Sequence, residues 1–225
     1  MYFSGEGPAG CPDPEFVEWL RPEEYCNESP EFINEGASAN DVRQGAIGNC
    51  WFISALSVLA TRDELVRGGI GSMEIDENFE VNQEIAMNFS NGVYPSIFHV
   101  YRFKGMFVFR FYKNFQWLYV VVDDRIPTEG RKPVFGHCKD DHELWVPLIE
   151  KAYAKLHGCY ESLISGYIDD GLTDLTGFVA EKIQLHQQNQ FPAKPLGTID
   201  DFWNFLLKRR AEKCLMGCSR AAKGE

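Results

Sequence analysis

The sequence predicts an α+β fold, in which a first helix precedes a small antiparallel sheet and further helices follow. Three features predict this order: helical spacing of apolar residues after Cys50, strand-like runs between residues 97 and 122, and amphipathic segments beginning near residues 144 and 199. Because helices and strands are grouped along the chain instead of alternating, a parallel βαβ arrangement is not expected. With 225 residues, of which 44% are hydrophobic, the chain can bury a substantial core.

The first helix is expected to begin at Cys50, directly after a glycine-containing turn from Gln44 to Gly48. Apolar residues at positions 52, 53, 55, 56, 58 and 59 follow helical rather than alternating spacing. A cysteine at this end of a helix faces unpaired amides and the positive end of the helix dipole, which favour the thiolate. The side-chain amide of Gln44, folded back over the thiol, can donate to an oxyanion. The pattern predicts the nucleophile and oxyanion donor of a thiol protease.

The small sheet is expected in the middle of the chain. Strand-like runs cover residues 97–102, 106–112 and 117–122. Lys113 and Asn114 suggest a hairpin between the last two runs. Asp123 and Asp124 end the third run, and carboxylates at the end of a strand usually cap a turn.

Two later helices are predicted, over residues 144–156 and 199–210. Thr198 or Asp200 can cap the second of them. Between these helices, three acidic residues lack the glycine and glutamate spacing of an EF-hand, so we expect them to lie in a solvated loop. They are Asp169, Asp170 and Asp174.

Composition argues against some kinds of partner and some cellular compartments. The formal net charge of −11 argues against nucleic acid as the main partner. No apolar run is long enough for a membrane span, and the amino terminus lacks a signal-peptide pattern. The seven cysteines have no metal-binding spacing, and their odd number favours reduced thiols over a disulfide framework. We therefore expect a cytoplasmic chain.

Several blocks of sequence resemble one family. Gln44 to Trp51 resembles the active-site segment of calpains, the calcium-dependent papain-like cysteine proteases. The further matching blocks, in family order, are Val120–Pro127, Glu143–Trp145, Leu148–Lys155, Gly158–Glu161 and Asp174–Gly177. The resemblance covers about residues 30–220 and implies a papain-like cysteine protease fold, of which this chain carries the first, helical subdomain of the calpain catalytic core with a small antiparallel sheet.

The resemblance also implies boundaries within the chain. Residues 1–29 are expected to form an amino-terminal arm, 30–213 the first subdomain, and 214–225 the start of the second subdomain. The segment from Cys214 to Ser219 resembles the strand that opens the second half of the core.

Three residues take roles in catalysis and substrate binding by this resemblance. Cys50 matches the nucleophile, and Gln44 matches the side chain of the oxyanion hole. Gly166 matches a glycine whose backbone pairs with an extended substrate, because glycine lets two main chains approach closely. Ser165 departs from a second glycine that animal members usually carry at this position.

A calcium site is implied in the same way. The matching ligands are the backbone carbonyls of Asn34 and Gly36 and the side chains of Asp41 and Glu143. Such hard oxygen ligands suit Ca²⁺. The family often has an arginine at the position of Ala39, where it pairs with the second half of the core, so that route of coupling is missing or rebuilt here.

The histidine and asparagine that complete papain-type chemistry are not found in their family context. None of the five histidines lies in a Gly-His-Ala sequence. His186 has roughly suitable spacing from Cys50, but its polar surroundings favour a surface histidine. The resemblance therefore predicts a calcium-dependent cysteine-type endopeptidase acting on protein substrates, with the second half of the core supplied by a longer product or a partner chain. The alternative is a catalytically inactive, calcium-binding fragment with a binding or regulatory role.

Overall fold

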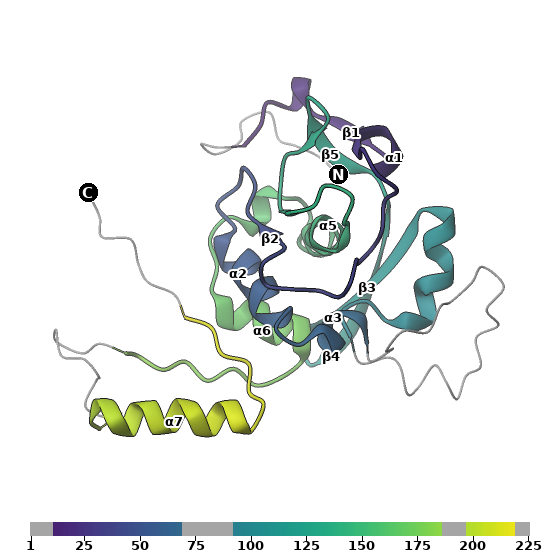
Figure 1. Cartoon of the computed structure of the whole chain (residues 1–225). Helices are drawn as coiled ribbons and strands as arrows, with labels where there is room; N and C mark the ends of the chain where they lie inside the picture. Colours follow the sequence, from purple (N-terminus) through teal and green to yellow (C-terminus); the bar gives the residue numbers. More distant parts are fainter. Residues whose placement is uncertain (1–10, 69–91, 186–196, 219–225) are drawn as a thin grey trace.

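Residues 11–68, 92–185 and 197–218 are described by the computed structural model of the chain. Helix α5 (Trp145–His157) lies at the centre, with most other elements arranged around it (Figure 1). Every residue from Trp145 to Ala154 is buried, as expected for a helix covered on all sides. Phe52 stacks on Tyr153 of this helix, with ring centroids 4.0 Å apart. The helix predicted at residues 144–156 is confirmed.

Helix α2 (Cys50–Leu59) begins at the predicted residue and packs against α6 (Ile168–Thr176). The two helices approach closely at Gly171, where a Cβ atom would lie 2.9 Å from the Cβ of Ala55. This packing buries the apolar side of α2 and leaves Cys50 exposed at its amino end.

The predicted hairpin is confirmed as β3 (Met106–Lys113) and β4 (Gln116–Asp123). The strands pair antiparallel from one end to the other. Asn114 and Phe115 form the turn with φ values of 50° and 63°, the pattern of a type I′ turn, which matches the twist of the flanking strands.

Short elements complete the fold. One three-stranded antiparallel sheet has the order β1-β5-β6, and a separate two-stranded sheet pairs β2 with β7. The bounds of these strands are β1 (Glu18–Leu20), β2 (Val42–Arg43), β5 (Ile126–Glu129), β6 (Lys132–Pro133) and β7 (His137–Cys138). The remaining short helices are η1 (Pro14–Phe16), α1 (Pro22–Tyr25), α3 (Asp63–Arg67) and η3 (Glu161–Leu163).

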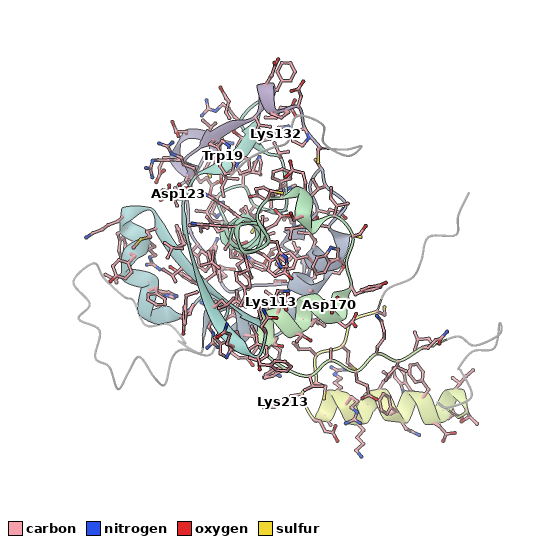
Figure 2. The ribbon with its side chains drawn as sticks, turned by 180° about the vertical axis from the view of Figure 1, so that it is seen from behind. Trp19, Lys113, Asp123, Lys132, Asp170 and Lys213 are labelled. Carbon is pink, nitrogen blue, oxygen red and sulfur yellow. The ribbon has the colours of Figure 1, made fainter. Side chains whose placement is uncertain are left out.

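Lys151 anchors α5 to the end of the hairpin. Its ammonium donates to the backbone carbonyls of Asp123 at 2.9 Å and Arg125 at 2.6 Å and forms an ion pair with the Asp123 carboxylate. The ammonium also lies 5.3 Å from the ring centroid of Trp19, in β1. Trp19 and Asp123 are labelled at the same end of the fold in Figure 2. The predicted arm thus contains a strand that contacts the core. The division of the chain at residues 29 and 213 remains a prediction.

The strand expected at residues 97–102 is wrong. This segment forms the 3-10 helix η2 (Ser96–Lys104), which begins after Pro95 and ends at Gly105 with a φ of 67°. Proline and a left-handed glycine are favourable boundaries for a helical segment. His99 is buried and stacks on Tyr94, with centroids 4.4 Å apart, and η2 packs beside β3.

The solvated loop expected around Asp169, Asp170 and Asp174 is also wrong, because these residues lie in α6. Two of the acids occupy the first turn, where they complement the helix dipole. Asp174 is buried; it accepts a hydrogen bond from the Tyr153 hydroxyl and pairs with Lys113. The lack of an EF-hand pattern excluded one kind of loop but did not exclude a helix.

Helix α7 (Ile199–Ala211) lies apart from the elements around α5 (Figure 1). Thr198 caps it as predicted, since its hydroxyl accepts from the Asp201 amide at 3.2 Å. None of its residues is buried.

No helix within the described ranges is long and apolar enough to cross a membrane.

Candidate active site and cation site

Cys50 is the first residue of α2 and its side chain is exposed. The preceding residue, Asn49, caps the helix through its backbone: its carbonyl accepts from the amides of Phe52 at 2.9 Å and Ile53 at 3.1 Å. The thiol is therefore accessible at the amino end of α2, which is the positive end of the helix dipole.

The side chain of Gln44 folds back over the turn that precedes Cys50. Its Nε2 donates to the carbonyl of Ile47 at 3.0 Å, and the residue is exposed. An amide nitrogen carries two hydrogens, so one remains for another acceptor. The turn that precedes Cys50 thus carries a side-chain amide with one N–H available as a hydrogen-bond donor.

The turn is fixed by the segment from residue 133 to residue 138. The Ala46 amide donates to the Val134 carbonyl at 2.9 Å, and β2 pairs with β7 just before the turn. At Gly45 a Cβ atom would lie only 2.2 Å from the backbone of Phe135. Only glycine permits this approach, which explains the glycine in the sequence pattern.

Gly166 lies in a segment that contacts both the turn and Trp51. The Ser165 amide donates to the Gly48 carbonyl at 3.2 Å, which ties this segment to the residues before Cys50. A Cβ at Gly166 would lie 2.4 Å from the indole ring of Trp51, so its backbone rests on that ring. Ser165 has a φ of 66°, a left-handed conformation that glycine adopts more easily than serine. The departure from a second glycine thus occurs at a position that favours glycine.

The histidines within the described ranges make their contacts away from Cys50. His99 stacks on Tyr94, His137 contacts the Phe135 carbonyl, and His142 lies 3.8 Å from the carboxylate of Glu28. Burial lowers the pKa of His99 to about 4 and, with the nearby Lys113, also lowers the pKa of His157. His186 lies outside the described residues. No hydrogen bond joins Cys50 to a histidine in the part of the chain that the structure describes.

The four residues that the resemblance assigned to calcium lie together. Asn34, Gly36, Asp41 and Glu143 line one polar depression of about 270 Å³. The remaining lining residues are Glu35, Ser38 and Asp140. The depression brings together a loop and the segment that leads into α5, which are about a hundred positions apart in the chain.

Backbone contacts fix the shape of the depression. Glu143 is buried, and its Oε1 accepts from the Asn34 amide at 3.0 Å. The Asp41 carboxylate accepts from the Ser38 amide at 2.8 Å. The loop turns at Gly36, with a φ of 107°. These contacts attach the Glu143 carboxylate to the loop at Asn34 and the Asp41 carboxylate at Ser38.

The depression is negatively charged. Burial raises the pKa of the Glu143 carboxyl, and the charges of Asp41 and Asp140 raise it further, while the Asn34 hydrogen bond acts in the opposite direction. Among the described residues, no lysine or arginine forms an ion pair with these three acids. A hard cation would relieve this repulsion, so the donor set fits Ca²⁺. No group of three or more His, Cys, Asp or Glu side chains in the described ranges is arranged to hold a metal, and the proposed set depends on two backbone carbonyls.

Two features of the sites were missed by sequence reasoning. Asp140 lines the cation depression, and its position three residues before Glu143 could have drawn attention to it. Glu150 lies beneath the turn before Cys50, bonded to Asn49 and Gly136. A single acid within the apolar run of α5 was the available signal.

Sequence comparisons match most of the chain to known proteins of one family. The family described as Calpain family cysteine protease matches residues 9–225. The calpain-2 catalytic subunit of Bos taurus is 34% identical over 203 residues, which cover 90% of this chain and 24% of that protein. Calpain-8 of Homo sapiens is 34% identical over 210 residues, or 93% of this chain and 25% of that protein. Calpain-5 of Mus musculus is 39% identical over 176 residues, or 78% of this chain and 24% of that protein. The chain spans about a quarter of the length of these curated relatives.

Proposed function

Because the chain belongs to the calpain family of cysteine proteases, we propose that it carries the nucleophilic part of a cysteine-type endopeptidase that cleaves protein substrates. The observation that carries this proposal is the exposed thiol of Cys50 at the amino end of α2, with the Gln44 amide folded over the same turn.

In the proposed reaction, the Cys50 thiolate attacks the carbonyl carbon of a peptide bond. The oxyanion that forms accepts hydrogen bonds from the Gln44 side chain and the Cys50 backbone amide. The carbon–nitrogen bond then breaks, the protonated amine leaves, and water hydrolyses the thioester to release the acid and restore the thiol. Gly166 offers exposed backbone beside this position for pairing with an extended substrate.

The histidine that moves the proton would come from the second half of the core, in a longer product or a partner chain. The exposed side of α7 supports this idea. Ile199, Trp203 and Leu207 are spaced four residues apart on this helix, so they share one face, and all three are exposed. Trp203 alone is 59% exposed. Helix α7 directly precedes the segment that resembles the start of the second subdomain, so its apolar face is a suitable contact for that half.

We propose Ca²⁺ as the cation of the depression formed by Asn34, Gly36, Asp41 and Glu143. When bound, Ca²⁺ would neutralise the carboxylates and hold the loop before α2 in one conformation. The loop is connected to α3, since the Ala37 amide donates to Asp63 at 2.8 Å and Asp63 pairs with Arg67. Reduced thiols also suit the cytoplasm, which we propose as the compartment; each of the seven cysteines is free.

A second candidate function is a calcium-binding regulatory fragment without proteolytic activity. The observation that favours it is that no histidine within the described ranges contacts Cys50. The two candidates share the cation site and differ in whether Cys50 is activated.

An active-site-directed epoxysuccinyl peptide separates the candidates. The protease proposal predicts covalent labelling of Cys50, faster with calcium than with a chelator, and loss of the calcium effect in Asp41→Ala. Mass spectrometry of the proteolytic peptides identifies the labelled cysteine, and Cys50→Ser is the control for attachment elsewhere. Labelling that is absent, or indifferent to calcium, would favour the regulatory fragment.

A further inference from the structure

Glu150 is an ionisable residue at the centre of α5 with no exposed surface. Its helix neighbours from Trp145 to Ile149 are apolar and buried. Within the described ranges it forms no ion pair with a lysine or arginine. Burying a carboxyl group without a cationic partner destabilises the fold unless hydrogen bonds compensate. The presence of Glu150 at this position therefore needs an explanation.

Two hydrogen bonds connect Glu150 to the two sides of the proposed active site. Its Oε1 accepts from the side-chain amide of Asn49 at 2.5 Å. Its Oε2 accepts from the backbone amide of Gly136 at 2.8 Å. Asn49 immediately precedes Cys50, and Gly136 belongs to the segment that holds the Gln44 turn.

The surroundings leave this arrangement little freedom. A Cβ atom at Gly136 would lie 2.7 Å from Ile53 and 3.0 Å from Glu150, so the Gly136 backbone is held directly against the carboxyl and α2. Asn49 has no exposed surface. Its side chain does not cap α2, because the cap is made by its backbone carbonyl. The Asn49 side chain is therefore used for the bond to α5.

We propose that Glu150 is a positioning residue for the proposed catalytic thiol: it fixes Asn49 and Gly136 to the rigid central helix and so sets Cys50 and the Gln44 turn relative to each other. This inference rests on the proposed function of Cys50. Small displacements between a nucleophile and its surrounding groups lower rates steeply, so a rigid support beneath both segments has a functional consequence.

Two substitutions separate the hydrogen bonds from simple filling of space. Glu150→Leu keeps a side chain of similar size but leaves both donors unpaired. Glu150→Gln can keep both bonds, because the Asn49 Oδ1 has no partner at present. If the Asn49 side-chain amide rotates by 180°, its Oδ1 can accept from the Nε2 of the introduced glutamine. The Oε1 of that glutamine can then still accept from the Gly136 amide. The conservative variant should therefore rescue what the leucine variant loses.

The measurement is the rate of alkylation of Cys50 by iodoacetamide in the full chain at neutral pH, relative to Cys214 in the same molecule. Cys214 is also exposed but follows α7, far along the chain from the turn. Peptide mass spectrometry after short pulses gives both rates, and circular dichroism confirms that each variant is folded. Asp174→Asn is the matched control, since Asp174 is another buried carboxyl bonded to α5 but does not touch the turn.

The inference predicts that Glu150→Leu lowers the relative rate at Cys50 about tenfold. Glu150→Gln should stay close to the wild-type rate, and Asp174→Asn should match the wild type. If Glu150→Leu does not fold, Asn49→Ala breaks the same link from the other side and should also lower the rate.

Two results overturn the inference. One is a wild-type relative rate in folded Glu150→Leu or in Asn49→Ala. The other is an equal decrease in Glu150→Leu and Asp174→Asn, which would indicate general loosening of the core. Failure of the proposed function has a different signature: wild-type Cys50 would then react no faster than Cys214.

Discussion

Helices α5 and α7 each contain 13 residues, yet they differ completely in their surroundings. Helix α5 is buried from Trp145 to Ala154 and supports both the proposed nucleophile and, through the adjacent Glu143, the proposed cation site. Helix α7 has apolar residues of similar size but buries none of them. Among the described residues, the core therefore packs around α5, whereas the apolar face of α7 stays exposed.

The largest expected effect tests this difference in burial directly. Trp145→Ala removes a fully buried indole from α5 and should lower the free energy of unfolding by about 3–5 kcal/mol. Trp203→Ala in α7 should change it by less than about 0.5 kcal/mol, because that indole is exposed. Urea unfolding followed by circular dichroism measures both. Equal losses would mean that α7 is part of the same core.

Between about pH 5 and pH 8, the unfolding free energy should depend on pH through a residue of α5 and not through one of α7. Burial raises the pKa of the Glu150 carboxyl to about 7, from the 4.5 of an ordinary glutamate. The folded chain therefore holds this proton more tightly than the unfolded chain. Its contribution to stability decreases as pH rises from 4.5 towards 7, by about 3 kcal/mol at most.

The pH effect is measured as the difference in unfolding free energy between wild type and Glu150→Gln at pH 5 and at pH 8. The variant should gain relative to wild type at pH 8. Asp201→Asn in α7 serves as the control: hydrogen bonds from Thr198 lower the Asp201 pKa, so that group titrates below this window. A difference that does not change with pH would mean that Glu150 keeps its charge in the fold.

Several of these features follow from the sequence, and others do not. The start of α2 and the β3–β4 hairpin were predicted because their signals are local: apolar spacing after Cys50, and a turn at Asn114 that tolerates positive φ. Segment η2 was missed because aromatic and β-branched residues also suit a strand. Its conformation is decided by Pro95, Gly105 and packing beside β3.

The sites show the same division. Cys50 and Gln44 are six positions apart and flank one turn, so a local pattern was enough to predict the turn between them. The cation depression joins Asp41 to Glu143, and only the resemblance brought these distant residues together before the structure did. The link from Glu150 to Asn49 crosses 101 positions, and no local pattern in the sequence indicates it.

Calcium should raise the unfolding free energy through the acids beside α5 and not through those of α7. If Ca²⁺ binds the folded state and not the unfolded state, a free concentration of a hundred times its Kd adds about 2.7 kcal/mol to the unfolding free energy. Asp41→Ala should abolish this gain, whereas Asp200→Ala, an acid at the start of α7, should leave it unchanged. Thermal unfolding in calcium and in chelator tests the difference, and an equal gain in Asp41→Ala would remove the proposed site.

The smallest expected effect concerns Ser165, the residue before Gly166. Ser165 holds a left-handed conformation with a φ of 66°, so Ser165→Gly should stabilise the chain by up to about 1 kcal/mol. The same change at Ser57, inside α2, should destabilise it by a similar amount, because glycine weakens a helix interior. Urea unfolding of both variants measures the pair. A loss of stability at both positions would show that the serine side chain at 165 matters more than its backbone conformation.

The central claim, that the amino end of α2 activates Cys50, is tested most directly by comparing two exposed thiols in one wild-type molecule. Cys50 is the first residue of α2, directly after the Gln44 turn, and Cys214 follows α7. Timed alkylation at neutral pH with peptide mass spectrometry gives the ratio of their rates. The account predicts that Cys50 reacts about tenfold faster or more, because cysteines at helix amino ends are commonly reactive. Equal rates would contradict it.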